Sequence, residues 1–99
     1  MLGWFILGVL LGAAVASFVF TVEYLTCYIM EQKLREVKKQ VKDANTKLGE
    51  MFTYMIKERR NDMIVVNLFD NQKNEVAEVN ITSEKGIANN LQVGLCNWI

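Results

Sequence analysis

The feature that most constrains this chain is an uninterrupted run of uncharged, mostly apolar residues from position 2 to position 22. Twelve of these 21 residues are Leu, Ile, Val or Phe. As an α-helix rising about 1.5 Å per residue, the run would be about 31 Å long, which matches a bilayer hydrocarbon core of about 30 Å. Trp4 near one end, and Tyr24 and Tyr28 beyond the other, are residue types that favour membrane interfaces. The run therefore predicts a single-pass membrane protein with its transmembrane helix in residues 1–23.

A cleaved signal peptide is the alternative interpretation of the same run. Ala14-Val15-Ala16 has the small-x-small form of a cleavage site, and cleavage at Ala16 would leave a small secreted domain. Two observations favour an uncleaved helix. No Lys or Arg precedes the run, and the run continues past Ala16 to Val22.

Charge is distributed unevenly along the chain. Residues 1–30 carry one charged side chain, Glu23, whereas residues 31–60 carry nine basic and five acidic residues, a net charge of +4. Residues 61–99 carry two basic and five acidic residues, a net of −3, so the overall net charge of zero is a cancellation. The basic residues that follow the run most closely are Lys33, Arg35, Lys38, Lys39 and Lys42. Because Lys and Arg beside a span resist translocation, they predict an external N-terminus and a cytoplasmic body.

Small residues recur every four positions inside the run, at Gly8, Gly12 and Ala16. On a helix this spacing places them on one face, where they form a smooth stripe that lets a second helix approach closely. The sequence thus predicts a helix-packing stripe.

A heptad repeat follows the apolar run, beginning at Met30. Its apolar residues recur at alternating spacings of four and three, a pattern typical of an amphipathic or coiled-coil helix. The seam consists of Met30, Leu34, Val37, Val41, Ala44, Leu48, Met51 and Met55. No proline interrupts it, so one helix is predicted to continue from the membrane through residues 24–60.

The partner of this seam stays open from the sequence alone. The regularity of the heptads favours self-association, but in a parallel pair Lys33 at a g position would face Lys38 at an e position and repel it. The chain's own C-terminal segment, or a helix of another protein, would cover the same face.

The apolar pattern changes near residue 61 to a period of about 2. Residues 63–69 are rich in β-forming side chains, residues 70–74 have the composition of a turn, and residues 75–81 alternate. These segments predict a β-hairpin in a small C-terminal module, residues 61–99. Residues 91–99 predict a third strand, with a short helix around residues 87–91 as the alternative. The expected fold is α+β: a transmembrane helix, a juxtamembrane helix and this module.

The chain offers no catalytic constellation. It has no histidine, its two cysteines stand alone at Cys27 and Cys96, and it lacks a Gly-rich phosphate loop and paired metal ligands. We therefore expect neither enzymatic activity nor a cofactor or metal. Nucleic acid is not an expected partner either, because the basic cluster lacks interleaved aromatic residues.

The function predicted from these patterns is a non-enzymatic anchor and interaction module. It would sit in the lipid bilayer, self-associate through its helix and bind an unidentified protein through its C-terminal segment. The alternative is a holin-like or toxin-like oligomer that permeabilises the membrane. The absence of a polar face along residues 2–22 argues against such a pore.

Overall fold

The apolar run folds as two consecutive strands. The computed structural model of the chain describes residues 2–10 and 13–99. In it β1 (Leu2–Leu10) and β2 (Ala13–Phe20) pair antiparallel. The predicted transmembrane helix is therefore wrong, and in the described part of the chain no helix is long and apolar enough to cross a membrane. The single-pass localisation with an external N-terminus and a cytoplasmic body depended on that helix and is corrected with it.

A period of two along β2 explains why this segment is a strand. The buried side chains of Ala16, Phe18 and Phe20 alternate with the half-buried Ser17 and the exposed Val19. Aromatic and β-branched residues such as these pack well on a pleated surface. The length of an uncharged run does not distinguish one spanning helix from two successive strands of a buried sheet. The signal-peptide alternative is also corrected, since Ala16 is fully buried in the middle of β2.

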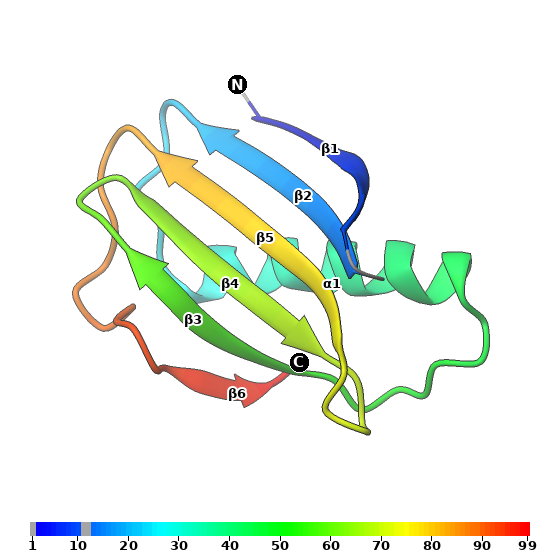
Figure 1. The fold of residues 1–99 in the computed structure, drawn as a ribbon. Coiled ribbons are helices and arrows are strands. Elements are labelled where there is room, and N and C mark those ends of the chain that lie inside the picture. The colour runs from blue at the N-terminus through cyan, green and yellow to red at the C-terminus, as the bar shows by residue number, and fades with distance from the viewer. Residues whose placement is uncertain (1, 11–12) are drawn as a thin grey trace.

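The strands form one sheet, drawn in Figure 1. Its order is β1-β2-β5-β4-β3-β6, with β3 (Thr53–Arg59), β4 (Met63–Phe69), β5 (Glu75–Ser83) and β6 (Cys96–Trp98). The pair β2–β5 is parallel and every other pair is antiparallel. The predicted hairpin is present as β4 and β5, and the last residues supply a third strand as β6, whereas residues 87–91 form no helix. The three strands predicted within residues 61–99 thus all belong to one sheet.

The helix α1 (Cys27–Ala44) is shorter than the heptad pattern predicts. Its N-cap is Thr26, whose hydroxyl oxygen accepts a hydrogen bond from the backbone N–H of Ile29 at 3.3 Å. It ends before Asn45, whose side-chain oxygen accepts from the backbone N–H of Lys47 at 3.2 Å. Such a local bond offers the backbone an alternative to the helix. A helix reaching residue 60 is therefore wrong, and residues 53–59 form β3 instead.

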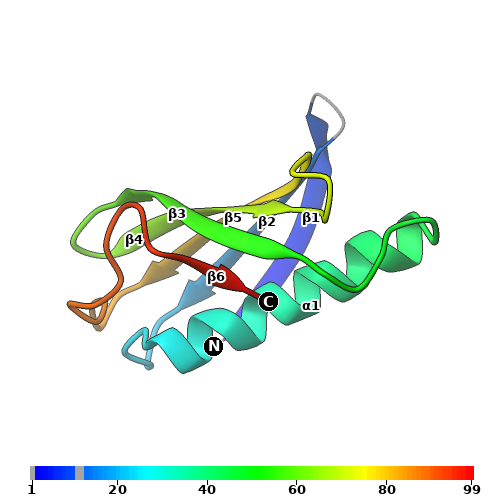
Figure 2. The same cartoon turned by 90° about the horizontal axis from the view of Figure 1, so that it is seen from below.

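The apolar face of α1 packs on one face of its own sheet, as Figure 2 shows from below. Met30, Leu34 and Val37 are fully buried there. Burying each such side chain contributes about 1.5–3 kcal/mol. The coiled-coil interpretation is therefore wrong. The face that the sequence left open to the C-terminal segment is covered by the chain's own sheet, to which the N-terminal strand β2 contributes as well as β5.

The opposite face of the sheet is not covered by a helix in the described residues, and the sheet has two free edges, β1 and β6. This face and these two edges are accessible to a binding partner.

Candidate functional site

A shallow hollow lies at the corner of the sheet where β6 ends the strand order. Its volume is about 490 Å³, and it is lined by Thr53, Tyr54, Met55, Phe69, Lys73, Cys96, Asn97 and Trp98. These residues come from β3, β6, the end of β4 and the β4–β5 turn. Segments more than twenty residues apart in the sequence therefore build the site together.

Strand alternation places the apolar wall of this hollow. Tyr54 and Ile56 are buried, so their neighbours Thr53 and Met55 lie on the face away from α1. The β3–β6 register pairs Thr53 with Trp98, and Met55 with Cys96, which brings all four residues to that same face. Trp98 is 62% exposed and Met55 is 39% exposed. A large aromatic side chain and a thioether chain are thus partly exposed to solvent on the same face of the sheet.

Lys73 enters the hollow from a turn with an unusual backbone. Its φ is +65°, in the left-handed region that costs a non-glycine residue about 1–2 kcal/mol. The Asp70 carboxylate holds this turn by accepting from the backbone N–H groups of Gln72 and Asn74, each at 2.9 Å. Strained residues of this kind concentrate at functional sites. Lys73 is also the one charged side chain among the lining residues.

The edge strand β6 presents backbone groups beside the hollow. Ile56 N–H donates to the Leu95 carbonyl, and Ile99 N–H donates to the Phe52 carbonyl, each at 2.9 Å. Because bonded and non-bonded pairs alternate in an antiparallel ladder, the backbone groups of Cys96 and Trp98 point away from β3. The Trp98 N–H donates to the side-chain oxygen of Asn97 at 2.9 Å, whereas the edge around Cys96 faces outward.

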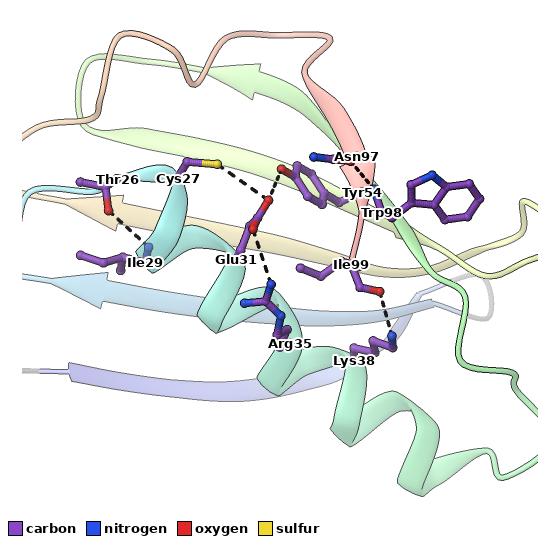
Figure 3. A network of polar contacts seen from close by, with 10 residues as sticks. All are labelled: Thr26, Cys27, Ile29, Glu31, Arg35, Lys38, Tyr54, Asn97, Trp98 and Ile99. Carbon is purple, nitrogen blue, oxygen red and sulfur yellow. Dashed lines mark hydrogen bonds and ion pairs between the residues drawn. The ribbon is translucent and has the colours of Figure 1, made fainter.

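A polar network lies behind the hollow, on the α1 side of the sheet (Figure 3). The Tyr54 hydroxyl donates to the Glu31 carboxylate at 2.7 Å, and Cys27 Sγ lies 3.8 Å from the same oxygen. Arg35 pairs with the other Glu31 oxygen at 3.6 Å. Burial raises the pKa of Cys27, with the nearby Glu31 charge adding to it, and burial together with the bond to Glu31 raises the pKa of Tyr54. Both groups are therefore held protonated.

A lysine of α1 fixes the end of β6 (Figure 3). Lys38 Nζ donates to the Ile99 carbonyl at 2.8 Å and to the Glu50 carbonyl at 2.6 Å, and it lies 5.2 Å from the centre of the Phe52 ring. Desolvation, helped by the neighbouring charges of Lys42 and Arg35, lowers the pKa of Lys38. The lysine thus ties β6 and the α1–β3 connection to the helix.

The structure disperses the predicted small-residue stripe. Gly8 lies in β1 and Ala16 in β2, while Gly12 lies outside the described residues. Because strands rather than a helix form here, these positions do not make a helix-packing face.

The predicted seam divides in two. Met30, Leu34, Val37 and Val41 are buried on α1, whereas Ala44 ends the helix exposed. Beyond the helix, Leu48 is half-buried and Met51 is exposed in the α1–β3 connection, and Met55 faces the hollow from β3. Met55 is therefore the seam residue that lines the candidate site, and it does so because residues 53–59 form a strand instead of the predicted helix.

The five basic residues predicted to set topology all lie on α1 and have partners within the chain. Lys33 bonds Glu36 at 2.8 Å, Lys39 bonds Asp43 at 3.3 Å, and Lys42 pairs with Glu50. Arg35 and Lys38 make the contacts described above. Lys33 is buried, with its Nζ 5.8 and 6.0 Å from the Phe18 and Phe20 ring centres. Four of the five thus pair with a carboxylate of the chain, and Lys38 bonds two backbone carbonyls instead.

Sequence reasoning did not identify the hollow. The signal available was the alternation of residues 96–98, which predicts a strand but does not say that its neighbour is β3, more than forty residues earlier. In the described residues, no group of three His, Cys, Asp or Glu side chains is arranged to hold a metal ion. No family model, no curated protein and no solved structure matches this chain.

Proposed function

We propose that this chain is a non-enzymatic binding domain that takes an extended segment of a partner protein alongside β6, with a bulky apolar side chain in the hollow. The observation that carries the proposal is the hollow of about 490 Å³ walled by exposed Trp98 and Met55. Its volume is in the range of about 300–1,000 Å³ found for binding sites. Tryptophan is also enriched among residues that dominate binding energy.

The charge at the hollow favours a particular partner chemistry. Lys73 lines the hollow, and none of the other lining residues is acidic or basic. A partner carboxylate beside the inserted apolar side chain would pair with this lysine. We therefore expect a motif that places an aromatic or large aliphatic residue next to Asp or Glu.

The free edge supports binding of an extended segment. A partner strand that pairs with Cys96 would exchange backbone hydrogen bonds there, the mode called β-augmentation. Because β6 has only three residues, the backbone supplies few bonds, and most of the affinity must come from the hollow.

The non-enzymatic part of the proposal is supported by the polar network. A nucleophilic cysteine needs a lowered pKa, whereas that of Cys27 is raised. The Tyr54 hydroxyl and the Glu31 carboxylate are engaged with each other at 2.7 Å, on the α1 side of the sheet.

Selection from a library of short random peptides against the immobilised chain tests the proposal. We expect the selected peptides to share a bulky apolar residue next to an acidic one, and to shift the amide signals of β3, β4 and β6 in NMR spectra. Trp98→Ala should weaken binding by about thirtyfold, which corresponds to about 2 kcal/mol.

Lys73→Gly separates binding from stability. Glycine adopts positive φ without strain, so this variant should be at least as stable as the wild type while binding acidic peptides less tightly. Val22→Ala, at an exposed site in the β2–α1 connection, is the control and should bind normally. Selected peptides that bind Trp98→Ala as tightly as the wild type would contradict the proposal.

A further inference from the structure

Asn67 is a buried amide on the face of the sheet that α1 does not cover. Its neighbours in β4, Val66 and Leu68, are fully buried in the core beneath α1, so strand alternation turns Asn67 to the opposite face. The residue is nevertheless only 6% exposed. In the described part of the chain its Oδ1 is buried and accepts no hydrogen bond. Burying an acceptor without a donor destabilises a fold, and a leucine at this position would avoid that penalty.

Long side chains from the two neighbouring strands surround Asn67. Met55 of β3 and Glu78 of β5 are its register partners. Lys57 pairs with Glu78 at 3.6 Å, so this ion pair joins β3 to β5 across β4. Met55 and Lys57 are both unbranched and partly exposed, and such side chains change rotamer readily. The amide is therefore enclosed by groups that can move aside, on a face without a helix.

The hollow at β6 lies directly beside Asn67. Met55, its neighbour across the β3–β4 pair, lines the hollow. Phe69 lines it too, two residues further along the same face of β4. Rotation of the Met55 side chain extends the hollow over β4 and brings the Asn67 oxygen to its inner end.

An acceptor without a donor at the end of an apolar hollow selects an apolar group that carries a donor. The indole of tryptophan has a large apolar surface, one N–H donor and no acceptor. A phenyl ring lacks the donor, and a phenol brings acceptor lone pairs that need a donor of their own. Sites with a buried hydrogen-bonding group reject analogues that leave this group unpaired. Indole is therefore the side-chain chemistry that matches the site.

We propose that the hollow recognises an indole, supplied by a tryptophan of the partner segment, whose N–H donates to Asn67 Oδ1 once Met55 has moved aside. This inference rests on the proposed function and specifies the residue that enters the hollow. Asn67 then determines the specificity, while Trp98 supplies apolar contact and Lys73 supplies charge.

Titration with indole and with benzothiophene tests the hydrogen bond without any peptide. The two molecules have nearly the same shape, but benzothiophene has a sulfur atom in place of the N–H group. Heteronuclear NMR spectra report binding through the side-chain amide signals of Asn67. Indole should bind about fivefold more tightly than benzothiophene, as one net hydrogen bond implies, and should shift these signals. Equal affinities, or binding of neither molecule, would overturn the inference.

Asn67→Leu removes the acceptor and keeps a side chain branched at Cγ. The variant should be at least as stable as the wild type in urea, because an unpaired buried acceptor is lost, and it should bind indole and benzothiophene equally. Asn80→Leu is the matched control. Asn80 lies in β5 opposite Val65, on the same face but outside the lining of the hollow, and its replacement should leave the fivefold preference intact. A preference for indole that persisted in Asn67→Leu would contradict the assigned role of Asn67.

Peptides distinguish this inference from the proposed function. Selected peptides that bind beside β6 but carry Phe or Leu as often as Trp would contradict the inference and leave the proposed function standing. Indole binding through Asn67 by a chain that binds none of the peptides would support the indole site and contradict the extended partner segment.

Discussion

At the scale of single residues, the contact between Tyr54 and Glu31 joins β3 to α1. The hydroxyl is buried and donates to a carboxylate at 2.7 Å, and hydrogen bonds to charged groups contribute about 1.5–3 kcal/mol. Tyr54→Phe should therefore lower the free energy of unfolding at pH 7 by roughly that amount, as measured by urea denaturation.

The same residue predicts how stability changes in alkali. The folded-state pKa of Tyr54 is raised, so its contribution is present in full below its unfolded pKa of about 10 and decreases as pH rises above that value. Cys27, also raised, acts in the same direction above about pH 9. The lowered pKa of Lys38 acts in the opposite direction, because its stability penalty disappears as the amine loses its proton. On balance the wild type should lose stability above about pH 10, and the loss should be smaller in Tyr54→Phe.

Tyr28→Phe provides the matched control for both measurements. Tyr28 is exposed on α1, and its removal should leave the free energy of unfolding and its alkaline decline as in the wild type. If Tyr54→Phe declined in alkali as steeply as the wild type, the buried phenol would not be the cause.

At the scale of elements, Arg59 fixes the loop that carries the chain from β5 to β6. Its guanidinium donates to the Leu91 carbonyl at 2.8 Å and to the Ile87 carbonyl at 3.1 Å. Arg59→Ala should free this loop, speed amide exchange over residues 87–95 and weaken peptide binding, because the loop leads directly into β6. Arg60→Ala is the control. Arg60 is exposed and pairs with Glu58 at the surface, so its loss should cost less than about 1 kcal/mol. Unchanged exchange in Arg59→Ala would show that other contacts hold the loop.

How well each element could be predicted depended on whether its pattern was local. The β4–β5 hairpin follows from alternation on both sides of a polar turn, and the buried face of α1 follows from Met30, Leu34 and Val37 at helical spacing. The heptad spacing continues to Met55 although the helix ends at Ala44. The spacing of apolar residues does not include the hydrogen bond by which the Asn45 side chain competes with the helix. The strands β1 and β2 were missed because an uncharged run satisfies the length test for a membrane helix equally well.

The candidate site could not be predicted because it depends on pairings between distant segments. Trp98, Met55 and Lys73 meet only after β6 has paired with β3 and the β4–β5 turn has closed beside them. A single sequence contains the strands but not their order.

At the scale of the whole molecule, the parallel pair β2–β5 ties the first twenty residues to the second half of the sheet. Ala77, Val79 and Ile81 of β5 are fully buried, and they lie between β2 on one side and β4 on the other, beneath α1. A fragment of residues 61–99 would keep β4, β5 and β6 but lose α1, β1, β2 and β3. Its core side chains would then face water, at a cost of about 1.5–3 kcal/mol for each large one.

We therefore expect residues 61–99 alone to give the far-UV circular dichroism of an unfolded chain. Adding residues 1–60 in trans should restore the sheet signal, because that fragment returns the helix, the parallel neighbour of β5 and the partner of β6. Val79→Asp in the smaller fragment should prevent this recovery, since the carboxylate would be buried between β2 and β4 without a partner. A fragment 61–99 that folded by itself would mean that the hairpin forms an independent module and that the parallel β2–β5 pair is not required for folding.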